Sequence, residues 1–193
     1  MDDIPSNFEI GMHYNYDTHL NESLFKDQYD ELQSCLNKPV VAGRAHYLKF
    51  DPSKSFDFLE NQNIQVDESV GFTHSIGFRA GLAGYYFPFN EKTEKEYQVL
   101  EIPVNFMDAR LVEQYAERAI ERFTEIAEHI SKIGGAISIV FHPGQFFNPE
   151  HKKMLGIYHK MLLVARQLSA ESKSATEILS DINQYSESES SLN

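Results

Sequence analysis

Ionisable side chains stand at the ends of four short apolar segments of this sequence. In chain order they are His13, Arg44 with His46, Asp67 and His142. When such segments alternate with helices as parallel strands, their carboxyl ends gather at one face, and active sites form there. We therefore expect these side chains to meet in one site.

His13 and Asp17 are the candidate metal ligands. They lie four positions apart, and histidine with a carboxylate is a common ligand set for Zn²⁺ or another divalent ion at a hydrolytic site. Such an ion polarises a carbonyl group and activates water near neutral pH. A surface histidine near an aspartate is also common without a metal, so a structural interpretation stays open.

His142, Arg44 and Asp67 are the candidate catalytic residues. His142 lies between an apolar segment and a proline and suits a general acid that protonates a leaving group. Arg44 could orient a carboxylate or an oxyanion by binding it. Asp67 could orient a histidine or an arginine in the same way. Each has a structural alternative: a histidine bonded to a backbone carbonyl, an arginine in a rim salt bridge, and an aspartate bonded to its own turn.

The segment Phe72–Phe89 is a candidate for substrate binding because it is rich in glycine and aromatic residues. Glycine lets a backbone approach a ligand closely, and aromatic faces hold sugar rings and other small ligands. Arg79 and Phe78 would contact the substrate there. The alternative is a loop packed by its own aromatic side chains, with Arg79 bound to a carboxylate.

The hydrophobic pattern predicts an α/β chain in which strands and helices alternate. The predicted strands cover 8–13, 40–43, 64–67, 97–106 and 136–141, and the predicted helices 22–36, 53–62, 109–133, 149–169 and 176–185. Pro103 indicates an edge or bulge in the fourth strand, and Gly134 with Gly135 ends the longest helix. We expect one domain over residues 1–170, followed by a short helix and a disordered Ser/Glu-rich tail over 171–193.

The composition argues against several classes of protein. The formal net charge of −12 opposes binding to nucleic acid or an anionic membrane surface. No apolar run is long enough to span a membrane, and the acidic N-terminus lacks the features of a signal peptide. The single cysteine excludes an internal disulfide framework. We therefore expect a cytoplasmic location.

Five short motifs occur in the order found in a bacterial branch of the polysaccharide deacetylases, and the chain resembles that family over residues 8–165. The motifs are Glu9-Ile10-Gly11-Met12-His13 with Asp17, Arg44-Ala45-His46-Tyr47, Asp67–Phe72 with Gly77–Gly81 and Pro88-Phe89, Leu100–Val104 with Met107-Asp108, and Phe141-His142-Pro143. Each motif is short, and the specificity of the resemblance comes from their common order.

The resemblance implies a distorted (β/α) barrel and the metal-assisted removal of acetyl groups from a glycan. His13 and Asp17 would then bind a divalent metal such as Zn²⁺. Arg44 would support the catalytic base, Asp67 would orient the arginine or its neighbours, and His142 would be the general acid. Arg79, Tyr47 and Phe78 would line the sugar site.

Two departures from the family pattern modify this expectation. The family opens with a strand whose acidic motif supplies the base and a metal ligand, and this chain has no counterpart to it. Tyr14 and Ala45-His46 also replace the usual residues of two motifs. We therefore expect a barrel that is incomplete at its N-terminus, through a missing segment, with exposed sheet edges that favour self-association.

Three functions follow as hypotheses. The first is a metal-dependent glycan deacetylase, inactive as this chain if the base is missing. The second is a non-catalytic relative that binds glycan or depends on a partner. The third is a structural fragment with no activity of its own.

Overall fold

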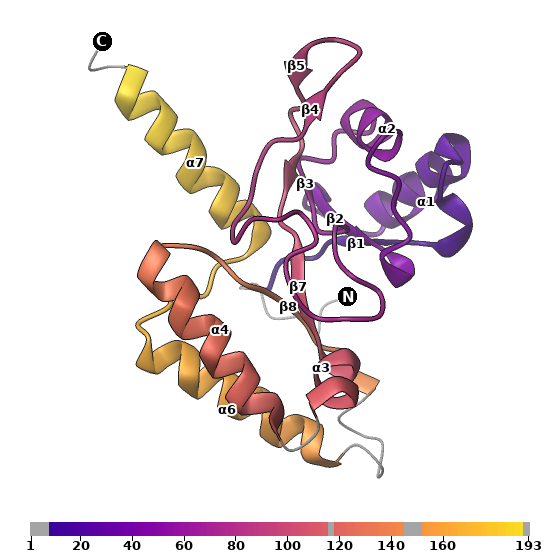
Figure 1. Ribbon diagram of the computed structural model, residues 1–193. Helices are drawn as coiled ribbons and strands as arrows, with labels where there is room; N and C mark the ends of the chain where they lie inside the picture. The colour runs from indigo at the N-terminus through magenta and orange to yellow at the C-terminus, as the bar shows by residue number, and fades with distance from the viewer. Residues whose placement is uncertain (1–7, 116–117, 145–151, 191–193) are drawn as a thin grey trace. The chain divides into compact units, whose positions relative to one another are not determined.

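The computed structural model describes residues 8–115, 118–144 and 152–190, and the chain divides into two compact units (Figure 1). The first unit comprises Met1–Val70, Tyr86–Ile102 and Lys173–Asn193. The second comprises Gly71–Tyr85 and Pro103–Ser172. The chain therefore passes between the units several times.

The first unit is built on a four-stranded sheet with the order β1-β2-β3-β6. Its strands are β1 (Met12–Tyr14), β2 (Ala42–Ala45), β3 (Val66–Asp67) and β6 (Leu100–Glu101). All three neighbouring pairs are parallel, so the four carboxyl ends share one edge. The predicted α/β class is thereby confirmed.

Helices and a hairpin surround this sheet. They are η1 (Tyr16–Thr18), α1 (Glu22–Ser34), η2 (His46–Leu48), α2 (Ser55–Asn61), the strands β4 (Phe89–Asn90) and β5 (Lys95–Glu96), and α7 (Ala175–Ser190). Asn21 caps α1 by accepting a hydrogen bond from the backbone N–H of Leu24 at 3.2 Å. This confirms the predicted N-terminus of the first helix.

Helix α7 extends further than the sequence predicts. Ser174 and Glu177 form a reciprocal capping box at its start, with the Ser174 N–H donating to Glu177 at 2.7 Å. The helix continues to Ser190, beyond residue 185, where the sequence predicts its end. Glutamate is a good helix former, and a capped, packed first half lets the Ser/Glu-rich half continue the helix.

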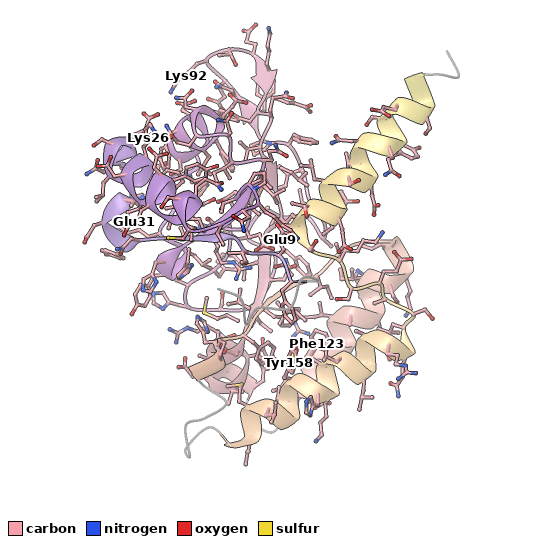
Figure 2. All side chains as sticks on the ribbon, turned by 180° about the vertical axis from the view of Figure 1, so that it is seen from behind. Glu9, Lys26, Glu31, Lys92, Phe123 and Tyr158 are labelled. Carbon is pink, nitrogen blue, oxygen red and sulfur yellow. The ribbon has the colours of Figure 1, made fainter. Side chains whose placement is uncertain are left out.

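The apolar face of α7 packs on the sheet of the first unit. Ile178, Leu179 and Ile182 contact a buried cluster in and directly after the strands, which consists of Ala42, Val66, Leu100 and Ile102. Glu9 accepts hydrogen bonds from the backbone N–H and the hydroxyl of Thr176, and Figure 2 shows it beside the start of the helix. The chain before β1 therefore fixes the helix that covers the sheet.

In its described part, the second unit contains two parallel strands and several helices. These are β7 (Val104–Met107), α3 (Asp108–Tyr115), α4 (Ala119–Ile133), β8 (Ser138–Val140) and α6 (Lys152–Gln167). Helices α4 and α6 lie side by side (Figure 1). Between them and the strands lies a core of Phe106, Leu111, Ala119, Phe123, Ala127 and Met161.

Two predicted elements are each divided in the structure. The strand predicted over 97–106 is β6 and β7, which lie in different sheets on either side of Pro103, since proline cannot donate to a ladder. The helix predicted over 109–133 is α3 and α4, with residues 116–117 outside the described chain. The end of α4 is confirmed, because Gly134 is left-handed with φ 71°.

The parallel sheets and their helices establish a mixed α/β chain, while the distorted barrel stays a prediction. The predicted opening of the last long helix at Pro149 lies outside the described residues. Among the described residues, none of the helices combines the length and apolar character that crossing a membrane requires.

Candidate functional site

His13 and His46 form a pair at the carboxyl edge of the first unit's sheet. The Nδ1 atom of His13 lies 3.1 Å from the backbone oxygen of Arg44. A carbonyl only accepts, so Nδ1 carries the hydrogen and Nε2 carries the lone pair when the ring is neutral. His46 Nδ1 lies 2.9 Å from that Nε2 and therefore donates to it.

Strand register and a tight turn bring the two rings together. His13 is aligned with Arg44 in the β1–β2 pairing, which places its ring beside the chain that leaves β2. Immediately beyond His46, Tyr47 and Leu48 both have left-handed backbones, with φ 56° and 51°. Such conformations cost free energy in residues other than glycine, so the surrounding fold holds the turn that presents His46.

Arg44 forms an ion pair with Glu68, and both side chains are about three-quarters buried. A salt bridge was the structural alternative to a catalytic role for Arg44. This salt bridge lies within the strand-end cluster. The Nε atom of Arg44 is buried and has no hydrogen-bond partner among the described residues. The guanidinium group is thus held in place by one carboxylate while part of its donor capacity is unused.

Asp67 joins the ends of β2 and β3 through Ser69. It accepts hydrogen bonds from the backbone N–H and the hydroxyl of Ser69, both at 2.9 Å. The hydroxyl oxygen in turn accepts from the backbone N–H of Ala45 at 2.9 Å. Asp67 therefore binds the backbone of its own turn, which was the structural alternative to a catalytic role. It also fixes the residue between Arg44 and His46.

Asp67 is not alone in the interior, because Glu101 is its aligned neighbour on β6 and both are fully buried. Burial raises the pKa of Asp67 to about 6. Burial and the adjacent Asp67 raise the pKa of Glu101 well above its ordinary value. Sequence reasoning missed Glu101, although an acid enclosed by the apolar residues Leu100 and Ile102 is a signal of a buried polar group.

Tyr47 and Asp17 lie near the surface of the same unit. Tyr47 is 72% exposed, its ring contacts His46 at a centroid distance of 4.4 Å, and it meets Tyr16 edge-on at 6.2 Å. The Lys49 ammonium lies 3.5 Å from the centroid of the Tyr16 ring. Asp17 is exposed in η1, and its predicted pairing with His13 at a metal stays a prediction.

The described residues include no group of three or more His, Cys, Asp or Glu side chains arranged to hold a metal ion. The two converging nitrogens of His13 and His46 are a partial donor set. Metal-binding histidines usually direct their other ring nitrogen to a carbonyl or carboxylate, and His13 directs Nδ1 to Arg44 in this way.

His142 and Asp108 form a dyad in the second unit. The side chain of Asp108 is fully buried, whereas that of His142 is 52% exposed. Asp108 accepts from the backbone N–H of His142 at 2.7 Å and lies 2.9 Å from Nδ1 of its ring. The carboxylate needs the hydrogen on Nδ1, so Nε2 is directed away from it. The sequence placed Asp108 in the motif with Met107 but did not indicate that it pairs with His142.

Arg79 and Phe78 belong to the glycine-rich segment of the second unit. Arg79 donates to the backbone oxygen of Gly71 at 3.1 Å, so it ties the loop to itself through a carbonyl. Gly77 donates to the backbone oxygen of Asn105 at 2.8 Å, and Phe78 is half-buried. These bonds hold the loop on its own unit, and substrate contact by Arg79 and Phe78 stays a prediction.

The structure thus brings His13, Arg44, His46 and Asp67 to one edge of one sheet. His142 and Arg79 lie in the other unit, and their meeting with the first group stays a prediction. Comparison with known proteins found no matching family model, no similar curated protein and no similar solved structure.

Proposed function

We propose that this chain is a glycan deacetylase-type hydrolase, in which His142 transfers a proton to the leaving group and the first unit binds a metal. The Asp108–His142 dyad carries the proposal. A buried carboxylate that fixes one imidazole nitrogen orients the other toward a reacting atom, which is the arrangement a general acid or base requires. The motif order of the sequence supplies the substrate class, an acetylated sugar.

His13 is the principal metal ligand in this proposal, with His46 facing it and Asp17 as a further candidate. The bond from Nδ1 of His13 to the Arg44 carbonyl supports this assignment, because it keeps the lone pair on Nε2, where a metal would replace the hydrogen bond from His46. A bound Zn²⁺ or similar ion would polarise the acetyl carbonyl and activate water. Arg44 is held at the same edge by Glu68. In this proposal its guanidinium group supplies positive charge to an anionic group of the reacting substrate.

The experiment is acetate release from an acetylated oligosaccharide by the full chain supplied with Zn²⁺. Replacing the acid normally costs about 10²–10⁴ in rate, so we expect His142→Ala and Asp108→Asn to lower release at least a hundredfold. His129→Ala, which changes an exposed histidine on α4, is the matched control and should retain activity. Chelation should abolish release, and Zn²⁺ should restore it except in His13→Ala.

A non-catalytic glycan-binding role is the alternative, favoured by the exposed rings of Tyr47 and Tyr16. Flat aromatic faces stack on sugars without chemistry. The same preparation distinguishes the two roles: saturable oligosaccharide binding, weakened about tenfold by Tyr47→Ala but not by Tyr185→Ala, without acetate release would support this alternative. A chain that neither releases acetate nor binds the oligosaccharide would contradict both roles.

A further inference from the structure

The buried carboxyl groups of Asp67 and Glu101 are an unusual feature of the first unit. Both residues are 0% exposed, and their strands place them directly opposite each other in a parallel pair. Two charges cannot both be retained at such a site without compensation, because each is removed from water and repels the other.

The hydrogen bonds around the pair differ between the two residues. Asp67 accepts two bonds from Ser69, one to each oxygen. Glu101 accepts one bond, from the backbone N–H of Val70 to Oε1 at 2.9 Å. Its second oxygen, Oε2, is buried without a hydrogen-bond partner among the described residues. A carboxylate oxygen without a donor is costly in the interior, whereas a protonated one is itself a donor.

Within the part of the chain that the structure describes, the elements packed against the pair supply no compensating cation. From β1, the buried hydroxyl of Tyr14 faces Asp67, and Glu68, beyond β3, adds negative charge near Glu101. Arg44 on β2 is engaged by Glu68. Helix α7 packs on the sheet residues that alternate with the pair and presents Ile178, Leu179 and Ile182 to them.

We infer that Asp67 and Glu101 share one proton, carried on Glu101, and that this singly charged pair locks the carboxyl ends of β2, β3 and β6. In this role Glu101 is a positioning residue. It holds Val70 directly and, through Asp67 and Ser69, the backbone of Ala45 between Arg44 and His46. The inference does not require the proposed hydrolase activity, since its test measures stability and protonation alone.

The pH dependence follows from the direction of the pKa shifts. Both carboxyl pKa values are raised in the folded chain, whereas an unfolded chain titrates them near pH 4. The folded state therefore binds the extra proton, and its stabilising effect is lost as pH rises through the folded pKa. Each pH unit in that window raises the unfolding equilibrium constant about tenfold for one proton.

The experiment measures urea unfolding of the full chain from pH 5 to pH 8, for wild type and for Glu101→Gln. Glutamine keeps the shape and the donor of a protonated glutamate. From pH 5 to pH 8 the folding equilibrium constant should fall in both proteins. We expect the fall to be at least tenfold larger for the wild type than for the variant. Glu31→Gln changes an exposed carboxylate on α1, which is not among the groups acting on the pair, and should leave the wild-type slope intact. Asp67→Asn, which loses an acceptor to Ser69, should be destabilised at every pH.

A second measurement uses the unaltered chain, so the inference stays testable if a variant fails to fold. Carboxyl ¹³C NMR should show one of the two side chains still protonated at pH 6. Both carboxyl groups titrating below pH 4.5 in the folded protein would overturn the inference, as would equal pH slopes for wild type and Glu101→Gln.

Discussion

At the residue scale, the strand-end cluster depends on a small residue beside a buried ring. Gly43 on β2 lies so close to Tyr14 that an added Cβ would stand 2.3 Å from the ring and 2.5 Å from its hydroxyl oxygen. Tyr14 is buried. Its burial and, to a smaller extent, the nearby charge of Asp67 raise the pKa of its hydroxyl group. Glycine therefore lets the ring approach the carboxyl pair.

Gly43→Ala should destabilise the chain, because neither the strand backbone nor the buried ring can move without loss of packing. Overpacking of this kind costs about 1–3 kcal/mol. Gly156→Ala is the matched control, since Gly156 lies in α6 with open space around its Cβ position and alanine favours a helix by about 0.5–1 kcal/mol. Urea unfolding should move in opposite directions for the two variants, and a shift of the same sign in both would contradict the packing argument.

At the scale of elements, α7 is joined to the sheet by an apolar face and by one carboxylate. Glu9 satisfies two donors of Thr176 in the first turn, where helix N–H groups otherwise lack partners. Negative charge at a helix N-terminus is also favourable. The segment before β1 is thus a structural cap for an element more than one hundred and sixty positions away in sequence.

Glu9→Ala should weaken the start of α7 and cost about 1 kcal/mol, the usual magnitude for a lost cap. The control is Glu31→Ala, which removes an exposed glutamate of α1, labelled in Figure 2, and should change stability by less than about 0.5 kcal/mol. Urea unfolding and backbone hydrogen exchange at Thr176 report the effect. Unchanged exchange at Thr176 in Glu9→Ala would refute the capping role.

At the scale of the whole molecule, groups of opposite titration behaviour define the pH range of stability. Asp57 on α2 accepts bonds from Tyr97 at 2.6 Å and Lys92 at 2.9 Å, and these partners lower its pKa. Its contribution is present above the unfolded pKa and is lost as pH falls through the folded pKa. Asp67 and Glu101 act in the opposite direction.

Asp57→Asn should therefore be less stable than wild type at pH 7, with a difference that shrinks as pH falls toward 3. The pH dependence of stability between pH 5 and pH 8 should be the same as in wild type, because the titration of Asp67 and Glu101 causes it. Asp30→Asn is the control, since Asp30 forms an exposed ion pair with Lys26 and such pairs contribute little. A constant difference between Asp57→Asn and wild type from pH 3 to 7 would contradict this assignment.

The sequence by itself determined the class of the chain and the type of residue at each strand end. Alternating apolar segments predicted parallel strands and helices. The predicted start of the first helix at residue 22 and the predicted stop at Gly134 are both confirmed, and His13, Arg44 and Asp67 do lie at one sheet edge. These features depend on local spacing and on backbone preferences, which a sequence displays directly.

Only the tertiary structure decided the partners. It paired His13 with His46, His142 with Asp108, and Asp67 with Glu101, whereas the sequence showed Asp108 and Glu101 only as members of short motifs. It also showed Arg44 and Arg79 already bonded within their own units. Register and burial arise from contacts between distant segments, and they set which ring nitrogen holds a hydrogen and which carboxyl group holds a proton.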